Sequence, residues 1–300
     1  MGVAVDGLKG IIAGPASSEL GAKIASALGW RLIPLEFKTF PDGESYIRID
    51  WGDFEGSEIV IVQSTHPPQD RHLMQLFLMA DAARDAGMGV EAVVPYLAYS
   101  RQDKMFRAGE AVSARTVCKM MRCAGIGKLF VLDVHSEEAL ARSGIPASNI
   151  TAMPHIGRYF LGKGLRDPIV VSPDEGAKRH AERVAGVLGC EASSFRKERD
   201  RITGEVSVTP SGARFSGRDV VLVDDMISTG GSMLKAMAAI RAEGPNRIFV
   251  ACTHPLLGEG VGRRLLEAGA EEIVGTDSFP NPFEKVSVAN AIAEALRSSA

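Results

Sequence analysis

The sequence predicts an α/β protein built from two related halves, each with a mainly parallel sheet flanked by helices. Short runs rich in β-branched residues alternate with segments of helical periodicity, which is typical of parallel α/β architecture. Residues 17–28 and 233–242 show the helical period most clearly, because their apolar side chains recur on one face. The runs that we expect to form strands are residues 10–13, 59–63, 90–95, 129–133, 169–172, 220–224, 248–253 and 272–275.

The length of the chain predicts two domains. At 300 residues, 45% of them hydrophobic, the chain exceeds a typical single domain and suits two domains of about 150 residues each. We place the boundary in the loop around residues 146–154, which gives a first domain of residues 1–150 and a second of residues 151–300. No low-complexity linker marks this boundary.

An internal similarity indicates that the two halves are related. Residues 120–131 align with residues 239–250, and at the same offset His135 falls on His254. Under this alignment one helix-turn-strand unit occurs twice. Duplication explains the match, but so does chance, because any two amphipathic helices that lead into buried strands share such spacing.

Charge and cysteine content exclude several classes of protein. Lys and Arg number 34 against 37 Asp and Glu, and no block of like charge indicates a nucleic acid or an anionic membrane as partner. The 4 cysteines lack the spacing of a zinc ribbon or a disulfide framework, and we expect them to be packing residues in a reducing cytosol. No run of 18 apolar residues and no leader is found, so we expect a cytoplasmic protein.

Residues 220–232 carry the strongest chemical signal. The string runs from an apolar strand through Asp224 and Asp225 and a turn of small residues into a helix. Glycines let the backbone approach an anion closely, and the amides at a helix N-terminus point at it with the positive end of the helix dipole behind them. We therefore expect a phosphate cradle formed by Ser228, Thr229, Gly230, Gly231 and Ser232.

The two acids before this cradle indicate what the phosphate is attached to. Asp224 and Asp225 would repel a phosphate, but carboxylates accept hydrogen bonds from sugar hydroxyls. A sugar phosphate is therefore the expected ligand. An ordinary strand-to-helix turn with capping hydroxyls is the alternative, and it explains a bare glycine pair better than it explains the whole string.

This string is similar to the ribose-phosphate binding signature shared by type I phosphoribosyltransferases and ribose-phosphate pyrophosphokinases. The resemblance implies that each half has the type I phosphoribosyltransferase fold. It also implies that Asp224 contacts ribose and that residues 228–232 hold its 5-phosphate. The signature is specific for ribose 5-phosphate but does not separate the two families.

Two segments of the first half favour the pyrophosphokinases. Residues 40–46 form a turn by their chemistry, with the reversal at Asp42-Gly43, and Phe40 could equally belong to the core. Residues 94–104 leave an apolar strand and become cationic and aromatic; an arginine fork beside a glutamine amide suits a polyphosphate and a purine edge. Both segments resemble ATP-binding loops of that family, which implies ATP contacts by Phe40, Asp42, Gly43, Glu44, Arg101 and Gln102.

His135 ends another expected strand, at the sheet edge where α/β proteins bind ligands. A lone histidine there is more often structural, but this one resembles the histidine with which the family contacts the metal and ATP. The sequence departs from the common bacterial and animal pattern just afterwards, where Glu137-Glu138-Ala139-Leu140 replaces a Gln-rich, double-Phe stretch. Archaeal-type members also diverge here, so the departure puts the allosteric and metal contacts of the classical form in doubt more than the reaction.

Two segments of the second half complete the resemblance. Asp174 lies where a strand turns into a helix, and such a carboxylate suits Mg²⁺ through water, although an acidic helix N-terminus explains the segment alone. It resembles the family's diphosphate loop, which implies a metal contact. Residues 194–201 look like a solvated surface loop, but Lys197 and Arg199 match the family's mobile catalytic loop, which implies that they reach over the reacting phosphates.

The chain is identified as an archaeal-type member of the ribose-phosphate pyrophosphokinase family by segments that follow one another from about residue 10 to residue 275. Membership implies transfer of the β,γ-diphosphate of Mg-ATP to the C1 hydroxyl of ribose 5-phosphate, for nucleotide biosynthesis. It also implies a homodimer or larger homo-oligomer. The alternatives are a type I phosphoribosyltransferase, which has no use for residues 40–44 or 101–102, and a non-catalytic regulatory subunit, which would be expected to lose Lys197 and Arg199.

Overall fold

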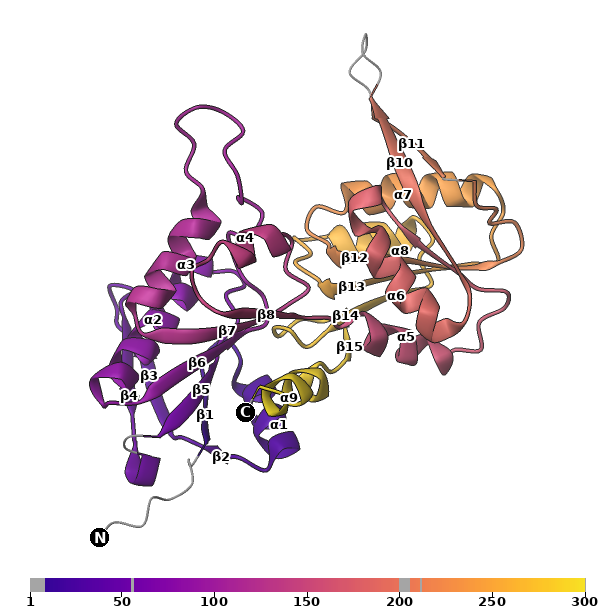
Figure 1. Ribbon diagram of the computed structural model, residues 1–300. Helices are drawn as coiled ribbons and strands as arrows, with labels where there is room; N and C mark the ends of the chain where they lie inside the picture. The colour runs from indigo at the N-terminus through magenta and orange to yellow at the C-terminus, as the bar shows by residue number, and fades with distance from the viewer. Residues whose placement is uncertain (1–8, 55–56, 200–205, 211, 300) are drawn as a thin grey trace. The chain divides into compact units, whose positions relative to one another are not determined.

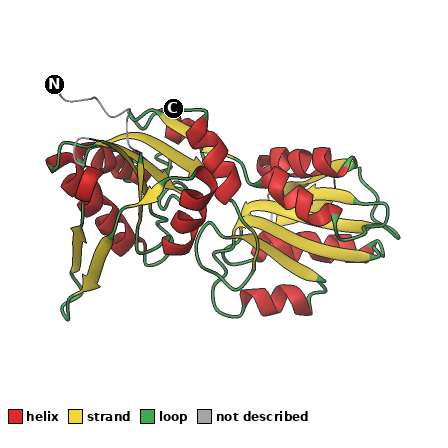
Figure 2. Ribbon diagram, turned by 90° about the horizontal axis from the view of Figure 1, so that it is seen from below, coloured by secondary structure: helices red, strands yellow, loops and turns green. Residues whose placement is uncertain are grey.

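The chain folds into two compact α/β units, which confirms the predicted fold class (Figure 1). The computed structural model describes residues 9–54, 57–199, 206–210 and 212–299, and for residues 197–199 and 206–210 it describes the backbone alone. Unit 1 comprises Met1–Thr151, Ser278–Pro280 and Val288–Ala300, and unit 2 comprises Ala152–Asp277 and Asn281–Ser287. In each unit the strands lie between helices (Figure 2).

Unit 1 contains a parallel sheet with the strand order β2-β1-β5-β6-β7-β8. A separate antiparallel hairpin, β3–β4, accompanies it. The strands are β1 (Gly10–Ala13), β2 (Arg31–Leu32), β3 (Leu35–Thr39), β4 (Ser45–Ile49), β5 (Glu58–Val62), β6 (Gly89–Val94), β7 (Ile126–Leu132) and β8 (Ala147–Ile150). The helices are α1 (Ser18–Leu28), η1 (Gly52–Phe54), α2 (Gln69–Asp85), α3 (Ser113–Cys123), α4 (Glu137–Ala141) and α9 (Ala289–Arg297).

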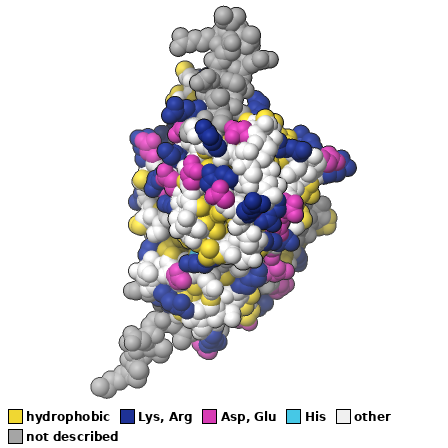
Figure 3. All heavy atoms as spheres, turned by 90° about the vertical axis from the view of Figure 1, so that its right-hand side faces the viewer, with side chains coloured by type: hydrophobic (Ala, Val, Ile, Leu, Met, Phe, Trp, Pro, Cys, Tyr) yellow, Lys and Arg dark blue, Asp and Glu magenta, His cyan; other side chains and the backbone are white. Residues whose placement is uncertain are grey.

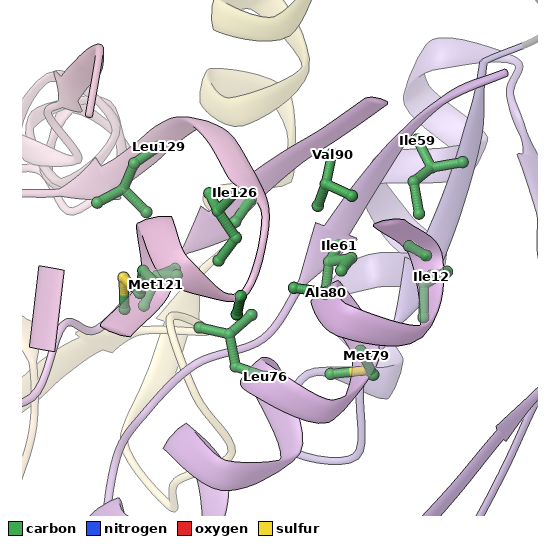
Figure 4. Packing of buried hydrophobic residues seen from close by; sticks show 14 of the residues in the cluster. Ile12, Ile59, Ile61, Leu76, Met79, Ala80, Val90, Met121, Ile126 and Leu129 are labelled. Atoms are coloured by element: carbon green, nitrogen blue, oxygen red, sulfur yellow. The ribbon is translucent and has the colours of Figure 1, made fainter. Parts of the chain in front are cut away.

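The periodicity of the sequence explains how unit 1 forms its core. In β5, Ile59 and Ile61 point to the same face because side chains alternate along a strand, and they pack in one cluster with Leu76 and Met79 of α2. Figure 4 shows these four side chains within that cluster. The residues of α2 that face the sheet recur at spacings of three and four, as expected of an amphipathic helix.

Unit 2 contains a sheet with the strand order β11-β10-β9-β12-β13-β14-β15, parallel except for the antiparallel pair β10–β11. The strands are β9 (Ile169–Ser172), β10 (Glu191–Arg199), β11 (Val206–Pro210), β12 (Asp219–Met226), β13 (Arg247–His254), β14 (Glu272–Thr276) and β15 (Glu284–Val286). The helices are α5 (Met153–Leu161), η2 (Glu175–Ala177), α6 (Lys178–Leu188), α7 (Gly231–Ala242) and α8 (Val261–Glu267). Residues of α5 and α6 pack on one face of the sheet, and residues of α7 and α8 pack on the other.

The two units repeat one arrangement of strands, but the sequence alignment does not match it. The order β2-β1-β5-β6-β7-β8 in unit 1 corresponds to β10-β9-β12-β13-β14-β15 in unit 2. The aligned residues 120–131 and 239–250 run from α3 into β7 and from α7 into β13, which are different places in the two sheets, because β7 corresponds to β14 and β13 corresponds to β6. The two aligned histidines differ in environment, since His254 is buried at 1% exposure and His135 is exposed.

The last helix packs within unit 1. Residues 288–300 belong to unit 1, where α9 packs against α1, whereas the sequence assigned residues 151–300 to one domain. Ile292 and Leu296 of α9 are buried, and Arg297 donates a hydrogen bond to the Ala27 carbonyl of α1. Periodicity predicts that such a helix buries one face, but it does not tell which sheet receives that face.

The surface carries charges of both signs. On the face drawn in Figure 3, basic and acidic side chains are interspersed. None of the helices in the described part of the chain has the length and apolar character that crossing a bilayer requires.

A buried carboxylate stabilises the start of β12 in unit 2. The side chain of Asp219 has 0% exposure and accepts hydrogen bonds from Arg247 Nη2 (2.6 Å), Asn246 Nδ2 (2.6 Å) and the Arg166 amide (2.7 Å). Burial alone would raise the pKa of Asp219, but these hydrogen bonds lower it below the ordinary value. Folding therefore favours the ionised form, and the stabilisation is present at neutral pH and lost as the pH falls through the acid range.

We predict that Asp219→Ala lowers the free energy of unfolding at pH 7 by about 2–4 kcal/mol, because it leaves these donors and the Arg247 charge without their acceptor. Denaturant titration followed by circular dichroism measures this. The difference from wild type should shrink below about pH 4, near the ordinary pKa of an aspartate. As a control, Glu191→Ala removes a half-exposed carboxylate from Arg218, which keeps the Asp167 carboxylate as a partner, and should cost at most about 1 kcal/mol. Equal stability of the two variants would contradict the prediction.

Candidate active site

Two acidic residues end β12, at the carboxyl edge of the unit 2 sheet. The Asp225 amide donates to Asp224 Oδ1 (2.9 Å), and the Met226 amide donates to Asp225 Oδ1 (2.7 Å). Asp225 is 8% exposed and Asp224 is half-buried. Burial, together with the negative charges of Asp225 and then Asp174, raises the pKa of Asp224 well above its usual range. The site therefore has an excess of negative charge that a cation would relieve.

The chain after these acids forms the loop that the sequence predicts, with Thr229, Gly231 and Ser232 exposed and Ser228 half-buried. Gly230 begins α7 with a positive φ of 74°, a backbone conformation that favours glycine. A Cβ on Gly230 would lie 2.8 Å from Val261 Cγ1, so the position also lacks room for a side chain. The strand, turn and helix thus come together as expected of a cradle.

The carbonyl groups of this loop are held by the chain that follows β13. The Ser228 carbonyl accepts a hydrogen bond from the Gly258 amide (3.4 Å), and the Thr229 carbonyl accepts one from Arg264 Nη2 (3.1 Å). The first amide of α7 with an intrahelical acceptor is that of Leu234, which donates to the Gly230 carbonyl (2.9 Å). The amides of the first turn are therefore available to an anion, with the helix dipole behind them.

Asp174 follows β9 and caps the short helix η2. Its Oδ1 accepts a hydrogen bond from the Ala177 amide (3.2 Å), and its carbonyl accepts one from Ser172 Oγ (2.8 Å). The segment thus has the geometry of an acidic helix N-terminus, which was the simpler alternative. The effect of Asp174 on the pKa of Asp224 shows in addition that its charge is felt at the end of β12.

The segment with Lys197 and Arg199 differs from the predicted loop. Both residues belong to β10, where Lys197 pairs with Val208 and Arg199 with Val206 of β11. The ribbon formed by β10 and β11 projects from the unit 2 sheet (Figure 1). Residues 196–199 of β10 are all charged, so this part of the sequence lacks the apolar period of a sheet strand and resembles a loop. The side chains of Lys197 and Arg199 lie outside the described part of the chain.

In unit 1, the predicted turn joins β3 to β4. The Gly43 amide donates to the Phe40 carbonyl (2.9 Å) and the Glu44 amide to Asp42 Oδ1 (3.2 Å), so the reversal occurs at Asp42-Gly43 as expected. Phe40 is 39% exposed and is not a core residue. Its ring meets the edge of Tyr46 at a centroid distance of 6.0 Å. Asp42, Gly43 and Glu44 are exposed beside it.

The predicted ATP loop after β6 is held by hydrogen bonds on both sides of Arg101 and Gln102. Tyr99 has a positive φ of 65° and donates from Oη to Asp70 Oδ1 (2.5 Å). Gln102 Oε1 accepts from Ser113 Oγ (2.7 Å). Arg101 and Gln102 are both exposed, so a ligand can reach them.

The sequence did not reveal the polar residues that support this loop from β5. Thr65 Oγ1 donates to the Tyr96 carbonyl (2.7 Å) and accepts from the Ala98 amide (2.7 Å), and it has 0% exposure. Gln63, also with 0% exposure, donates to the His72 carbonyl and accepts from the Ala16 amide. The sequence signal that could have found these residues is that Gln63 and Thr65, which are polar, follow an apolar strand directly.

His135 and Asp174, the predicted metal contacts, belong to different units. His135 is exposed in the bend between β7 and α4 of unit 1, and Asp174 is half-buried in unit 2. Within the part of the chain that the structure describes, no three His, Cys, Asp or Glu residues are arranged to hold one ion by themselves.

Comparison with known proteins decides the family. The profile described as "N-terminal domain of ribose phosphate pyrophosphokinase" matches residues 10–125, and that of the "Phosphoribosyl transferase domain" matches residues 148–284. The ribose-phosphate pyrophosphokinase of Methanopyrus kandleri is 43% identical over 284 residues, which cover 93% of this chain and 95% of the relative. The chain belongs to the ribose-phosphate pyrophosphokinase family.

Other members of the family agree with this assignment. The pyrophosphokinase of Sulfolobus acidocaldarius is 39% identical over 280 residues, covering 93% of this chain and 96% of the relative. The crystal structure of phosphoribosylpyrophosphate synthetase from Mycobacterium smegmatis has a TM-score of 0.86 and 28% identity, with 97% of this chain and 98% of that chain covered. The resemblance inferred from sequence motifs, and the fold of each half, are confirmed.

We predict that Asp224→Asn makes the protein more stable than wild type at neutral and higher pH. Because the folded-state pKa of Asp224 is raised, wild type loses stability as the pH rises from about 4 through that pKa, and an uncharged amide avoids this loss. The melting temperature at pH 8 should rise by about 2–4 °C or more, the shift that 1 kcal/mol gives in a domain of this size. Below pH 4 the difference should disappear. A variant that melts no higher than wild type at pH 8 would contradict the raised pKa of Asp224.

Proposed function

We propose that this chain is a ribose-phosphate diphosphokinase, which transfers the β,γ-diphosphate of Mg-ATP to the C1 hydroxyl of ribose 5-phosphate and releases AMP. One observation carries the proposal: two carboxylates stand directly before an anion-binding loop at the sheet edge of unit 2, in a chain that belongs to this family over nearly its full length. Such an arrangement suits a sugar whose hydroxyls meet the acids and whose phosphate meets the loop.

The ribose 5-phosphate site lies in unit 2 under this proposal. The amides and hydroxyls of residues 228–232 bind the 5-phosphate, and the close approach at Gly230 excludes a side chain that would block them. Asp224 accepts hydrogen bonds from the ribose diol, with Asp225 beside it. An arginine near the loop, Arg264, adds positive charge while it holds the Thr229 carbonyl.

The charges of the site fit a magnesium ion. Mg²⁺ prefers oxygen ligands and keeps several waters and substrate phosphates in its shell, so it does not need three ligands from the protein. Burial and the negative charges of Asp225 and Asp174 raise the pKa of Asp224, and a divalent cation would offset these charges. We propose that Asp174 in unit 2 and His135 in unit 1 contact the ion. When bound, it would neutralise charge on the diphosphate oxygens.

Diphosphoryl transfer needs positioning and electrostatic stabilisation from the protein more than covalent chemistry. The C1 hydroxyl oxygen attacks the β-phosphorus, the bond from that phosphorus to the bridging oxygen of AMP breaks, and the hydroxyl proton is lost. In our proposal Lys197 and Arg199 are catalytic and stabilise the charge that shifts during transfer. Phe40, Asp42, Gly43, Glu44, Arg101 and Gln102 bind ATP.

We further propose a cytoplasmic homo-oligomer of at least two chains. In the family resemblance, residues 42–44 complete the ATP site of a neighbouring subunit, and their exposure on the β3–β4 turn allows this. The cysteines Cys118 and Cys252 are buried as packing residues and Cys190 is half-buried, whereas Cys123 is exposed.

The alternatives are less favoured. A type I phosphoribosyltransferase corresponds to one unit of this chain, whereas pyrophosphokinase relatives match both. A non-catalytic subunit would be expected to lose Lys197 and Arg199, and both are present.

The test is AMP formation that requires both ATP and ribose 5-phosphate, measured by a coupled assay with Mg²⁺. We predict that Lys197→Ala lowers turnover by about 100 to 1,000-fold, because it removes one preorganised donor to shifting charge, while the melting temperature stays at the wild-type value. Lys197→Arg should recover part of the loss. The exposed Lys119 of α3 provides a control, and Lys119→Ala should keep full turnover. A wild-type chain that forms no AMP would refute the proposed function.

A further inference from the structure

Glu175 connects the turn that contains Asp174 to strand β10. It is the first residue of η2, and its Oε1 accepts a hydrogen bond from Ser194 Oγ (2.8 Å). Arg196 Nε lies 3.9 Å from the same oxygen. Ser194 is 1% exposed, whereas the side chains of Glu175 and Arg196 are 53% and 71% exposed. The buried hydroxyl of Ser194 thus donates its hydrogen bond to a carboxylate from another element.

These contacts lie where β10 leaves the main sheet. Ser194 is the last residue of β10 that pairs with β9, opposite Ser172, and from Phe195 onwards β10 pairs with β11. Phe195 has 0% exposure, and its ring lies 6.1 Å from that of Phe215. Ser194 and Phe195 therefore form the base from which the β10–β11 ribbon projects.

The direction of the ribbon must be set at this base. Two strands paired only with each other are marginal on their own, so the ribbon takes its orientation from the contacts of its first residues in β10 and from those of β11 with α7. Pairing with β9 and the packing of Phe195 hold the ribbon to the sheet and the core. The hydrogen bond to Glu175 is the contact that holds it to the turn after Asp174.

We propose that Glu175 is a positioning residue, which fixes the ribbon, and with it Lys197 and Arg199, relative to the turn that contains Asp174. This inference rests on the proposed function, in which Lys197 acts on the diphosphate that the turn receives. Glu175 itself need not touch substrate, since its carboxylate is engaged by Ser194 and Arg196 on the side of β10.

A surface ion pair without a functional role is the competing explanation. The contact between Glu175 and Arg196 is long and exposed, and such pairs contribute little to stability. The two explanations differ in what they predict for turnover. If Glu175 positions the ribbon, breaking its bond to Ser194 affects kcat even in a protein that stays folded.

The experiment compares kcat and KM of Glu175→Ala, Ser194→Ala and the double variant in the AMP assay. Each single change should lower kcat by about 10 to 100-fold, since displacement of a catalytic group by about 1 Å has effects of this size, and the KM for ribose 5-phosphate should stay within about twofold. The kcat of the double variant should lie within about twofold of the kcat of the less active single variant, because both changes remove the same interaction. Glu175→Gln keeps an acceptor for Ser194 and should restore kcat to within about threefold of wild type.

The matched control lies at the other end of the same strand. Glu191, the first residue of β10, is half-exposed like Glu175 and pairs with Arg218 (2.7 Å). Glu191→Ala removes one negative charge and one ion pair from β10 without touching the base of the ribbon, and it should keep wild-type kcat. Melting curves followed by circular dichroism show which variants are folded at the assay temperature.

A second comparison tests whether Glu175 acts through Lys197. In a Lys197→Ala background, Glu175→Ala should lower kcat much less than it does in wild type, because the group that it positions is already gone. Wild-type kcat in folded Glu175→Ala, or an undiminished effect in the Lys197→Ala background, would overturn the inference and leave the proposed function intact. A wild-type chain without AMP formation would instead overturn the proposed function.

Discussion

Repulsion among carboxylates at the carboxyl edge of the unit 2 sheet is the constraint on which the proposed site depends. The parallel arrangement brings the residues after β9 and β12 to one edge, so Asp174 and the pair Asp224-Asp225 cannot avoid one another. Burial of Asp224 and this repulsion together raise its pKa. A cation and a sugar that donates hydrogen bonds would both relieve the repulsion, whereas a bare anion would not. In the proposed site, the amides that begin α7 bind the anion one turn later.

The same fold has a different sheet edge in unit 1. Where unit 2 has Asp224 and Asp225 at the end of β12, the equivalent strand β5 is followed by Gln63 and Thr65, which are buried and hydrogen-bonded to the backbone around them. These polar groups are satisfied within the unit and support the loop that contains Arg101 and Gln102. The two halves thus share an architecture but differ in the chemistry of one sheet edge, which agrees with a catalytic unit 2 and an ATP-binding unit 1.

Much of the architecture could be predicted because it depends on local patterns. Apolar runs with β-branched residues located the central strands of each sheet, and the acids and glycines of residues 224–232 located the strand-turn-helix. The short strands β2, β8 and β15 were not located, and the β10–β11 ribbon could not be found this way, since residues 196–199 are all charged. The packing of α9 against α1 was also not predicted, because the amphipathic pattern of a helix does not specify which element it packs against. The bond between Glu175 and Ser194 joins residues 19 positions apart and is specified by tertiary structure alone.

The roles of the individual site residues depend on where ribose 5-phosphate binds, and a crystal structure of the protein with ribose 5-phosphate and Mg²⁺ tests this most directly. The account predicts the 5-phosphate within hydrogen-bonding distance of the amides of residues 229–232, with the ribose hydroxyls at Asp224. A sugar phosphate bound instead in unit 1, around Arg101, with residues 228–232 empty, would contradict it.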